Sequence, residues 1–462
     1  MTLKSRLYAL ILTSIILRVI VFFMLPNTPS VIAPDEGTYG RAANWTALGK
    51  PATEFPDYGA GLYASGRSLL LPAAFLNKIG FSPLDSVRLT SSLYGLLTLC
   101  LATAVILMTA SKNTNFAHFA KRNPRVLITL FLTFAFLPSH FVWSNLGLRE
   151  SATGFWVVSV FAFLFLLLQL NKRVSLLTIT GFLISIVMVF SARPQVGWVL
   201  GISLLLYLVA KIRDNLGRAL ILATLIGITL GYAATVSTVY ELETTFSATN
   251  LTSNSMDGFN TNISCKFDAE VVQVNNDKYF CISKTKKVYS RDLKNPGKAF
   301  LEQIGAIPYH HEVNKLGAAS VIETQFCPNR GVSQFDKYFC IGYRAPYTTF
   351  TFLFRPILGA DITSSASLFA AVENVFWFSA ILFIVIMFIR NRRLAFFGAL
   401  APSLLFFSIY SVAAGAYEGN MGTAFRHKSL ILWVVILLVA STIVATQQRK
   451  AEREGVSASS QE

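Results

Sequence analysis

The chain contains 462 residues, of which 53% are apolar and 14% are charged, and its formal net charge is +16. A soluble protein is excluded, because one core cannot bury this much apolar surface. Nucleic-acid binding is also excluded, since the basic residues form short clusters between apolar segments, as topology signals do, instead of one patch.

Apolar segments long enough to cross a bilayer, about 20 residues each, recur along the chain. The sequence therefore predicts an all-α polytopic membrane protein with about ten transmembrane helices. They are expected at residues 7–25, 92–110, 126–144, 151–170, 174–190, 196–210, 219–238, 366–389, 394–413 and 429–446. Between the first two spans, the semi-apolar stretch 67–79 is expected to lie flat on the membrane surface or to form a short re-entrant or buried segment.

Lysine and arginine clusters occupy alternate connections between these spans, and the positive-inside rule makes that side cytoplasmic. The clusters are Lys4 and Arg6, 112–125, Lys172 and Arg173, 211–218, 390–393 and 449–453. We therefore expect a multi-pass protein of the plasma (inner) membrane with both termini in the cytoplasm. The predicted organisation is an N-terminal membrane module at 1–239, an extracytoplasmic segment at 240–365, a C-terminal membrane module at 366–446 and a cytoplasmic tail at 447–462.

Four of the five cysteines lie in the segment that the charge rule places outside, in a compartment where disulfides persist. They are Cys265, Cys281, Cys327 and Cys340, whereas Cys100 falls inside a span. The string DKYFCI occurs at 277–282 and again at 336–341, each time downstream of another cysteine. Two similar disulfide-closed units, Cys265–Cys281 and Cys327–Cys340, are the simplest interpretation, while the other pairings and a zinc site stay open.

The predicted outer loop 26–91 carries two adjacent carboxylates, Asp35 and Glu36, shortly after the first span. In the first turn of a helix that starts near Pro34, they would stabilise its N-terminus. Near the outer leaflet, a carboxylate could also deprotonate an acceptor hydroxyl or hold a divalent cation, the one cofactor that the sequence leaves open. The two roles are compatible, because a capping neighbour would orient the catalytic acid.

Several basic residues lie at the ends of spans on the same predicted outer face. The candidates for binding a phosphate are Arg149, Arg193, Arg355 and Arg426, with His427 and Lys428 beside the last of them. Guanidinium groups bind phosphate bidentately, although each arginine taken alone could also snorkel to the interface.

Further site candidates are Arg88, Glu150, Glu373 and Glu418. Glu373 and Arg18 fall within predicted spans, where charged groups usually face the bundle interior or a cavity. For Arg18, snorkelling to the membrane surface is the alternative.

The string PDEGTYGRAA after the first span, and LLLPAAFLNKIGFSPLDSVRLTSSLYG before the second, resemble the GT-C membrane glycosyltransferases. The closest resemblance is to glycosyltransferase family 39, whose relatives include protein mannosyltransferases and lipid A aminoarabinose transferase. The resemblance implies a GT-C-like fold and a sugar donor carried on polyprenyl phosphate. It also implies that Asp35, with Glu36 beside it, is the essential acid, acting as a base or at a metal site.

We therefore expect a glycosyltransferase that moves a sugar from a polyprenyl-phosphate-linked donor to a cell-envelope acceptor, which is a glycan, a lipid or a protein. The bilayer, the donor and the acceptor are the expected partners. An oligosaccharide polymerase or ligase that uses polyprenyl-diphosphate glycans is the first alternative, and it would depend on the later arginines at least as much as on Asp35. A transporter or flippase for a lipid-linked glycan is the second, and it would predict inverted repeats.

Overall fold

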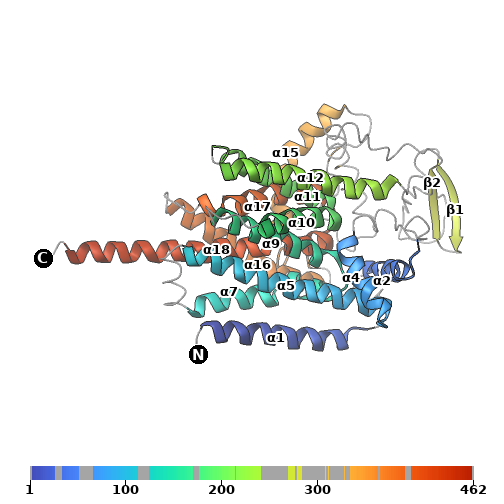
Figure 1. Ribbon diagram of the computed structural model, residues 1–462, viewed down its shortest axis with the longest axis horizontal. Helices are drawn as coiled ribbons and strands as arrows, with labels where there is room; N and C mark the ends of the chain where they lie inside the picture. Colours follow the sequence, from blue (N-terminus) through green and yellow to red (C-terminus); the bar gives the residue numbers. More distant parts are fainter. Residues whose placement is uncertain are drawn as a thin grey trace.

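The computed structural model describes residues 3–26, 34–50, 66–112, 124–169, 176–213, 215–240, 269–275, 278–283, 333–362, 365–390 and 397–459, together with the single positions 307, 311 and 327. The described helices form one elongated bundle (Figure 1). The start of the first helix and the end of the last helix lie at one end of this bundle, and α2 and α4 lie at the other (Figure 1). We call the latter the α2 end.

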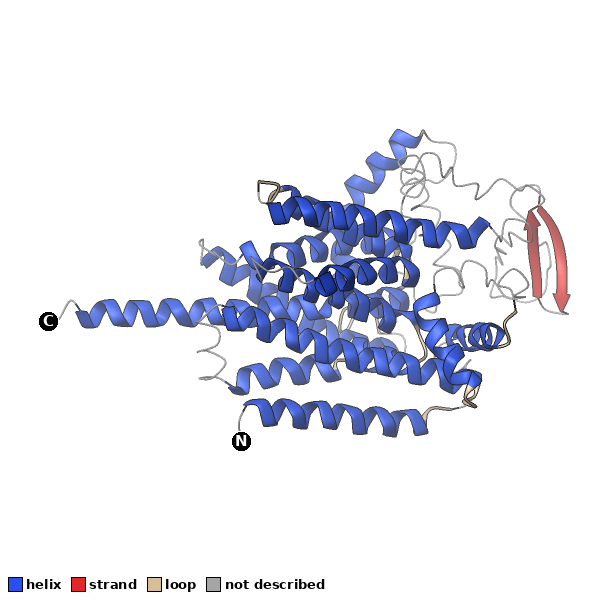
Figure 2. Ribbon diagram, in the orientation of Figure 1, coloured by secondary structure: helices blue, strands red, loops and turns tan. Residues whose placement is uncertain are grey.

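The described chain is helical apart from one hairpin of two antiparallel strands (Figure 2). The helices are α1 (Leu3–Met24), α2 (Pro34–Ala47), α4 (Arg67–Lys78), α5 (Pro83–Lys112), α7 (Pro124–Phe136), α8 (Pro138–Asn145), α9 (Arg149–Gln169), α10 (Leu176–Ala192), α11 (Pro194–Val209), α12 (Asn215–Tyr240), α15 (Gln334–Phe354), α16 (Ser365–Arg390), α17 (Phe397–Tyr417) and α18 (Met421–Ser459). The strands are β1 (Ala269–Asn275) and β2 (Lys278–Ser283).

Six described helices are long and apolar enough to cross a membrane, namely α1, α5, α9, α12, α16 and α18. A seventh span results if α7 and α8 count as one, although the pair bends by 43° at Pro138, where a proline ring cannot continue the helical hydrogen bonds. The apolar parts of α10, α11 and α17 are shorter. These apolar helices indicate a membrane-embedded protein, while length and composition alone support six or seven spans instead of the ten expected.

The core lies around α9 and α18, which carry the most buried of the apolar stretches. Phe161 of α9 packs its ring against Trp433 of α18 and Phe406 of α17, with centroids 5.1 and 5.6 Å away. In α18, 72% of the most apolar stretch is buried, against only 22% in α1. The first helix therefore lies at the edge of the bundle, as Figure 1 also shows.

The helix expected at 67–79 is present as α4, which packs on α2 and α5 at the α2 end. Leu69, Leu70 and Ala73 form its buried face. Leu71 and Phe75 lie on its exposed face, so α4 has apolar side chains on two sides. A second apolar face toward the surroundings is the pattern that an interfacial helix requires.

The two copies of DKYFCI adopt different structures, so the predicted pair of similar units is wrong at the level of local structure. The first copy contributes Lys278 to Ile282 to strand β2, which pairs with β1. The second copy begins α15, where the Ser333 hydroxyl accepts a hydrogen bond of 3.1 Å from the Asp336 amide and caps the helix. The cap and the packing of α15 on α17 select the helix.

The predicted disulfide between Cys327 and Cys340 is confirmed, with Cα atoms 6.1 Å apart. It ties the segment before α15 to the second turn of that helix. Cys265 lies outside the described residues, so the pairing Cys265–Cys281 stays a prediction.

We expect Cys340→Ser to lower the free energy of unfolding by about 3 kcal/mol, because a bridge across a loop of this length restricts the unfolded chain. Thermal unfolding of the purified protein in detergent, with and without reductant, measures the effect. Cys100→Ser is the matched control, since Cys100 is a free cysteine. Equal stability of the reduced and oxidised wild-type protein would contradict the prediction.

Candidate functional site at the α2 end

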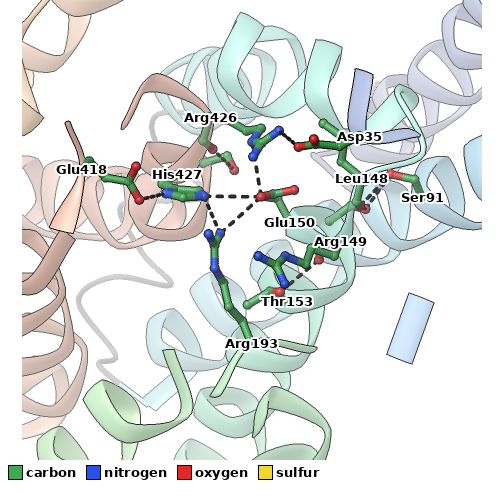
Figure 3. A network of polar contacts seen from close by, with 12 residues as sticks. Asp35, Ser91, Leu148, Arg149, Glu150, Thr153, Arg193, Glu418, Arg426 and His427 are labelled. Atoms are coloured by element: carbon green, nitrogen blue, oxygen red, sulfur yellow. Dashed lines mark hydrogen bonds and ion pairs between the residues drawn. The ribbon is translucent and has the colours of Figure 1, made fainter. Parts of the chain in front are cut away.

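Ionisable side chains from α2, α9, α18 and the turn before α11 meet at the α2 end of the bundle (Figure 3). Glu150, the second residue of α9, is at their centre. Its Oε1 lies 3.2 Å from Arg193 Nη1, 3.2 Å from Arg426 Nε and 3.3 Å from His427 Nε2. We call Asp35, Glu150, Arg193, Glu418, Arg426 and His427 the Glu150 network.

The local sequence positions these groups. Pro194 starts α11, so Arg193 immediately before it has extended backbone and its side chain reaches across to α9. Arg426 and His427 occupy the second turn of α18, and Glu418 precedes that helix. The network therefore depends on four helix starts, those of α2, α9, α11 and α18, that converge at one end of the bundle.

His427 lies between two carboxylates. Its Nδ1 is 2.5 Å from Glu418 Oε1, while its Nε2 faces Glu150 and Arg193. A histidine whose one ring nitrogen is bound by a carboxylate has its ring orientation set, which leaves the other nitrogen for a proton transfer or a charge contact.

Asp35 forms the exposed edge of the network. Its Oδ2 is 3.0 Å from Arg426 Nη1, and its side chain is 53% exposed, whereas that of Glu150 is only 2% exposed. Arg426 thus bridges an accessible carboxylate and a buried one. Asp35 also stands in the first turn of α2, so the predicted stabilising role at that helix start fits the same position.

Two further residues complete the surroundings of Asp35 and Glu150. Figure 3 places Arg149 beside Glu150. Tyr39, one turn after Asp35 on α2, is buried, and this burial raises the pKa of its phenol to about 12. Tyr39 therefore stays neutral at physiological pH. Its spacing of four residues from Asp35 is the sequence signal that could have identified it.

Glu36 and Arg88 form a separate buried pair. Glu36 Oε1 lies 2.5 Å from Arg88 Nη2, and Arg88 Nε donates to Oε2 at 3.2 Å, with both side chains at most 1% exposed. This fork holds α2 against α5. Of the predicted acid pair, Asp35 is accordingly the accessible member, and Glu36 and Arg88 are structural anchors in this geometry.

Lys428 turns away from its neighbour His427 into a second polar cluster. Its Nζ donates to Asn374 Oδ1 at 2.6 Å and to the Arg355 carbonyl at 3.0 Å. Glu373 accepts from the Ser139 amide at 2.7 Å and from Trp377 at 2.9 Å. Asn374 is a functional candidate that no sequence signal singles out.

The guanidinium of Arg355 pairs with Asp361, at 2.5 Å between Nη2 and Oδ1. This pair closes the turn between α15 and α16. Arg355, Lys428 and Glu373 thus lie near the Glu150 network without a described contact to it, whereas Asp35, Glu150, Arg193, Glu418, Arg426 and His427 are brought together.

Within the described part of the chain, no group of three or more His, Cys, Asp or Glu side chains could hold a metal ion. Glu36, one of the two acids considered for a divalent cation, pairs with Arg88 instead. Comparison with protein-family models, curated proteins and solved structures finds no match to this chain.

The pH dependence of stability provides a test of the Glu418–His427 contact. Burial alone would raise the pKa of Glu418, but His427, Arg193 and Arg426 lower it below its ordinary value of 4.5. A carboxylate with a lowered folded pKa stabilises the protein above its unfolded pKa and loses that contribution as the pH falls through the folded pKa. We expect the melting temperature to fall below pH 4.5.

In Glu418→Gln, the decrease in melting temperature at acid pH should be smaller by a few degrees than in the wild-type protein. Thermal unfolding between pH 3 and pH 7 measures this decrease. Asp336→Asn, at an exposed carboxylate in the first turn of α15, is the control. If the melting temperature of Glu418→Gln fell as steeply at acid pH as that of the wild-type protein, the stabilising role of the Glu418–His427 contact would be contradicted.

Proposed function

We propose that this protein is a GT-C-like membrane glycosyltransferase that moves a sugar from a polyprenyl-phosphate-linked donor to a cell-envelope acceptor. The observation that supports it is the Glu150 network, which joins the accessible Asp35 through Arg426 to buried charges.

The chemistry needs a base and a stabilised leaving group. The acceptor hydroxyl attacks the anomeric carbon and gives its proton to Asp35, while the bond from that carbon to the phosphate oxygen breaks. The electron pair leaves with polyprenyl phosphate. Arg426 and Arg149 can stabilise this anion, because guanidinium groups bind phosphate strongly where water is excluded.

The position of the chain termini relative to the Glu150 network supports a site on the extracytoplasmic side of the membrane. The start of α1 and the end of α18 lie at one end of the bundle, and α2, which carries Asp35 of the Glu150 network, lies at the other (Figure 1). With the termini in the cytoplasm, as the positive-inside rule predicts, the network faces the opposite side. A lipid-linked donor on that leaflet would reach Asp35 beside the apolar outer face of α4.

A polymerase or ligase for polyprenyl-diphosphate glycans is the second candidate. It is favoured by the central position of Glu150, Arg193 and His427, which are all more deeply buried than Asp35. In addition, Glu150 Oε2 is buried without a hydrogen-bond partner among the described residues, so it could accept a hydrogen bond from an incoming hydroxyl.

The decisive experiment uses the full chain in proteoliposomes. Radiolabelled polyprenyl-phosphate sugar, or polyprenyl-diphosphate oligosaccharide, is supplied with a cell-envelope lipid and glycan fraction, and the products are separated by chromatography. Release of polyprenyl phosphate with label in the acceptor supports the transferase. Use of the diphosphate donor alone selects the polymerase, and movement of intact donor across the bilayer overturns both. Arg149→Ala tests the phosphate contact in the same assay.

A further inference from the structure

Arg18 is a buried arginine of α1 that the Glu150 network does not use. It lies six residues before Met24, the end of α1, which is about 9 Å along the helix axis. Its side chain points into the bundle and is only 3% exposed, so it does not snorkel. Nη1 donates to Ser144 Oγ at 2.5 Å, and the guanidinium carbon is 5.3 Å from the Phe141 ring centroid.

Two of its three guanidinium nitrogens are unsatisfied. Nε and Nη2 of Arg18 are buried and have no hydrogen-bond partner among the described residues. No described carboxylate forms an ion pair with it either: Glu36, Glu150 and Glu418 pair with other basic groups, and Glu373 accepts from Ser139 and Trp377. A buried charge without a counter-ion lowers the stability of the folded protein by several kcal/mol. We therefore expect an anion to bind at Arg18.

The neighbouring polar groups form two short rows. Ser14 lies one turn before Arg18 on α1, and His140 lies one turn before Ser144 on α8. Ser14 Oγ and His140 Nε2 are also buried without a partner among the described residues. Gly95 of α5 leaves room for the contact, since a Cβ atom there would lie 3.0 Å from Arg18 Nη1 and 2.5 Å from Ser144 Cβ.

The position of α1 indicates how an anion could arrive. It is the least buried candidate span and lies at the bundle edge, with Leu12, Val19 and Phe23 exposed on its apolar outer faces. A free anion would have to cross apolar surroundings to reach Arg18. The phosphate of a lipid starts at the membrane interface, and its chains can lie along the apolar outside of α1 while the phosphate enters beside it.

We propose that Arg18, with Ser14, His140 and Ser144, binds the phosphate of a membrane lipid between α1 and α8. The site is separate from the Glu150 network and does not depend on sugar transfer. The phosphate ester belongs to an anionic phospholipid or to the polyprenyl carrier, and the experiment distinguishes the two.

The test measures thermal unfolding of the delipidated full chain in detergent. Phosphatidylglycerol and polyprenyl phosphate are added separately, each beside its phosphate-free counterpart, diacylglycerol or polyprenol. A lipid that binds the folded protein raises its melting temperature. We expect a rise only with a phosphate-bearing lipid, and Arg18→Met should weaken the apparent affinity by about 10- to 100-fold. Stabilisation by polyprenyl phosphate alone, if it persists in Arg426→Met and is weakened in Arg18→Met, assigns the site to the carrier. The same pattern with both lipids assigns it to phosphate esters generally.

Arg6→Met is the matched control on the same helix, and it should respond as the wild-type protein does. Arg426→Met separates this site from the Glu150 network, because the stabilisation by lipid should persist in it. Equal stabilisation by phosphate-free lipids, or an unchanged response in Arg18→Met, overturns the proposal. If Arg18→Met does not fold, a photo-crosslinking phosphatidylglycerol or polyprenyl phosphate on the wild-type protein decides: label in α1 and α8 is expected, and its absence there overturns the site.

Discussion

Asp35→Asn is expected to lower sugar transfer by about 10²- to 10⁴-fold, the usual contribution of a general base. The amide keeps the size of the side chain but cannot take the proton of the acceptor hydroxyl. Because Asp35 is half exposed at the edge of the network, the fold should persist. Initial rates with radiolabelled polyprenyl-phosphate sugar, together with a thermal unfolding curve, measure both properties.

Asp85→Asn is the matched control for this substitution. Asp85 is another first-turn acid, partly exposed at the start of α5, where it accepts a hydrogen bond from Ser82. It shares the favourable position at a helix N-terminus but makes no described contact with the Glu150 network. Normal transfer by a folded Asp35→Asn protein would refute the base assignment. A normal rate in Asp35→Asn with loss in Arg193→Lys would point to the polymerase.

Glu150→Leu is expected to destabilise the protein by about 3–5 kcal/mol, because removal of one partner leaves buried charge uncompensated. The contacts Arg426–Asp35 and His427–Glu418 would remain in this variant. Arg193, however, would lose the carboxylate with which it pairs. Arg193 is only 9% exposed, so water cannot replace that carboxylate. Thermal and denaturant unfolding in detergent measure the loss.

A double substitution makes this prediction sharper. Glu150→Leu combined with Arg193→Met removes both members of the buried pair, so it should recover part of the lost stability. Asp336→Leu, at an exposed first-turn acid of α15, serves as the control and should change stability by no more than about 1 kcal/mol. A Glu150→Leu protein as stable as the wild type would show that the network does not hold these helices together.

Hydropathy located the apolar helices: nine of the ten predicted spans each overlap one described helix, and the span at 126–144 falls on both α7 and α8. Local sequence did not predict secondary structure where the packing partner of a segment determines whether it forms a strand or a helix. The two copies of DKYFCI have one sequence but become a strand beside β1 and a helix packed on α17. Short segments have only a weak intrinsic preference, and packing overrides it.

For the candidate site, residue type and predicted depth selected charges that meet in the Glu150 network, together with others that do not, and indicated none of their partners. Glu150 and Glu418 were two acids among several, and their roles at the centre of the network depend on which helices converge. The sequence groups Arg355 and Lys428 with Arg426 because all three lie near span ends. Their partners, Asp361 and Asn374, come from a turn and a helix face that the chain order does not reveal.

The amino-acid sequence by itself determined that the chain is a helical membrane protein with an acid pair after the first apolar span, because apolar length and charge spacing are local properties. Only the tertiary structure decided what each acid does. Successive residues of a helix point about 100° apart, so Glu36 faces Arg88 of α5 and is buried, while its neighbour Asp35 is exposed and meets Arg426 from the far end of the chain. Which of two adjacent carboxylates can act on a substrate therefore depends on the packing of α2.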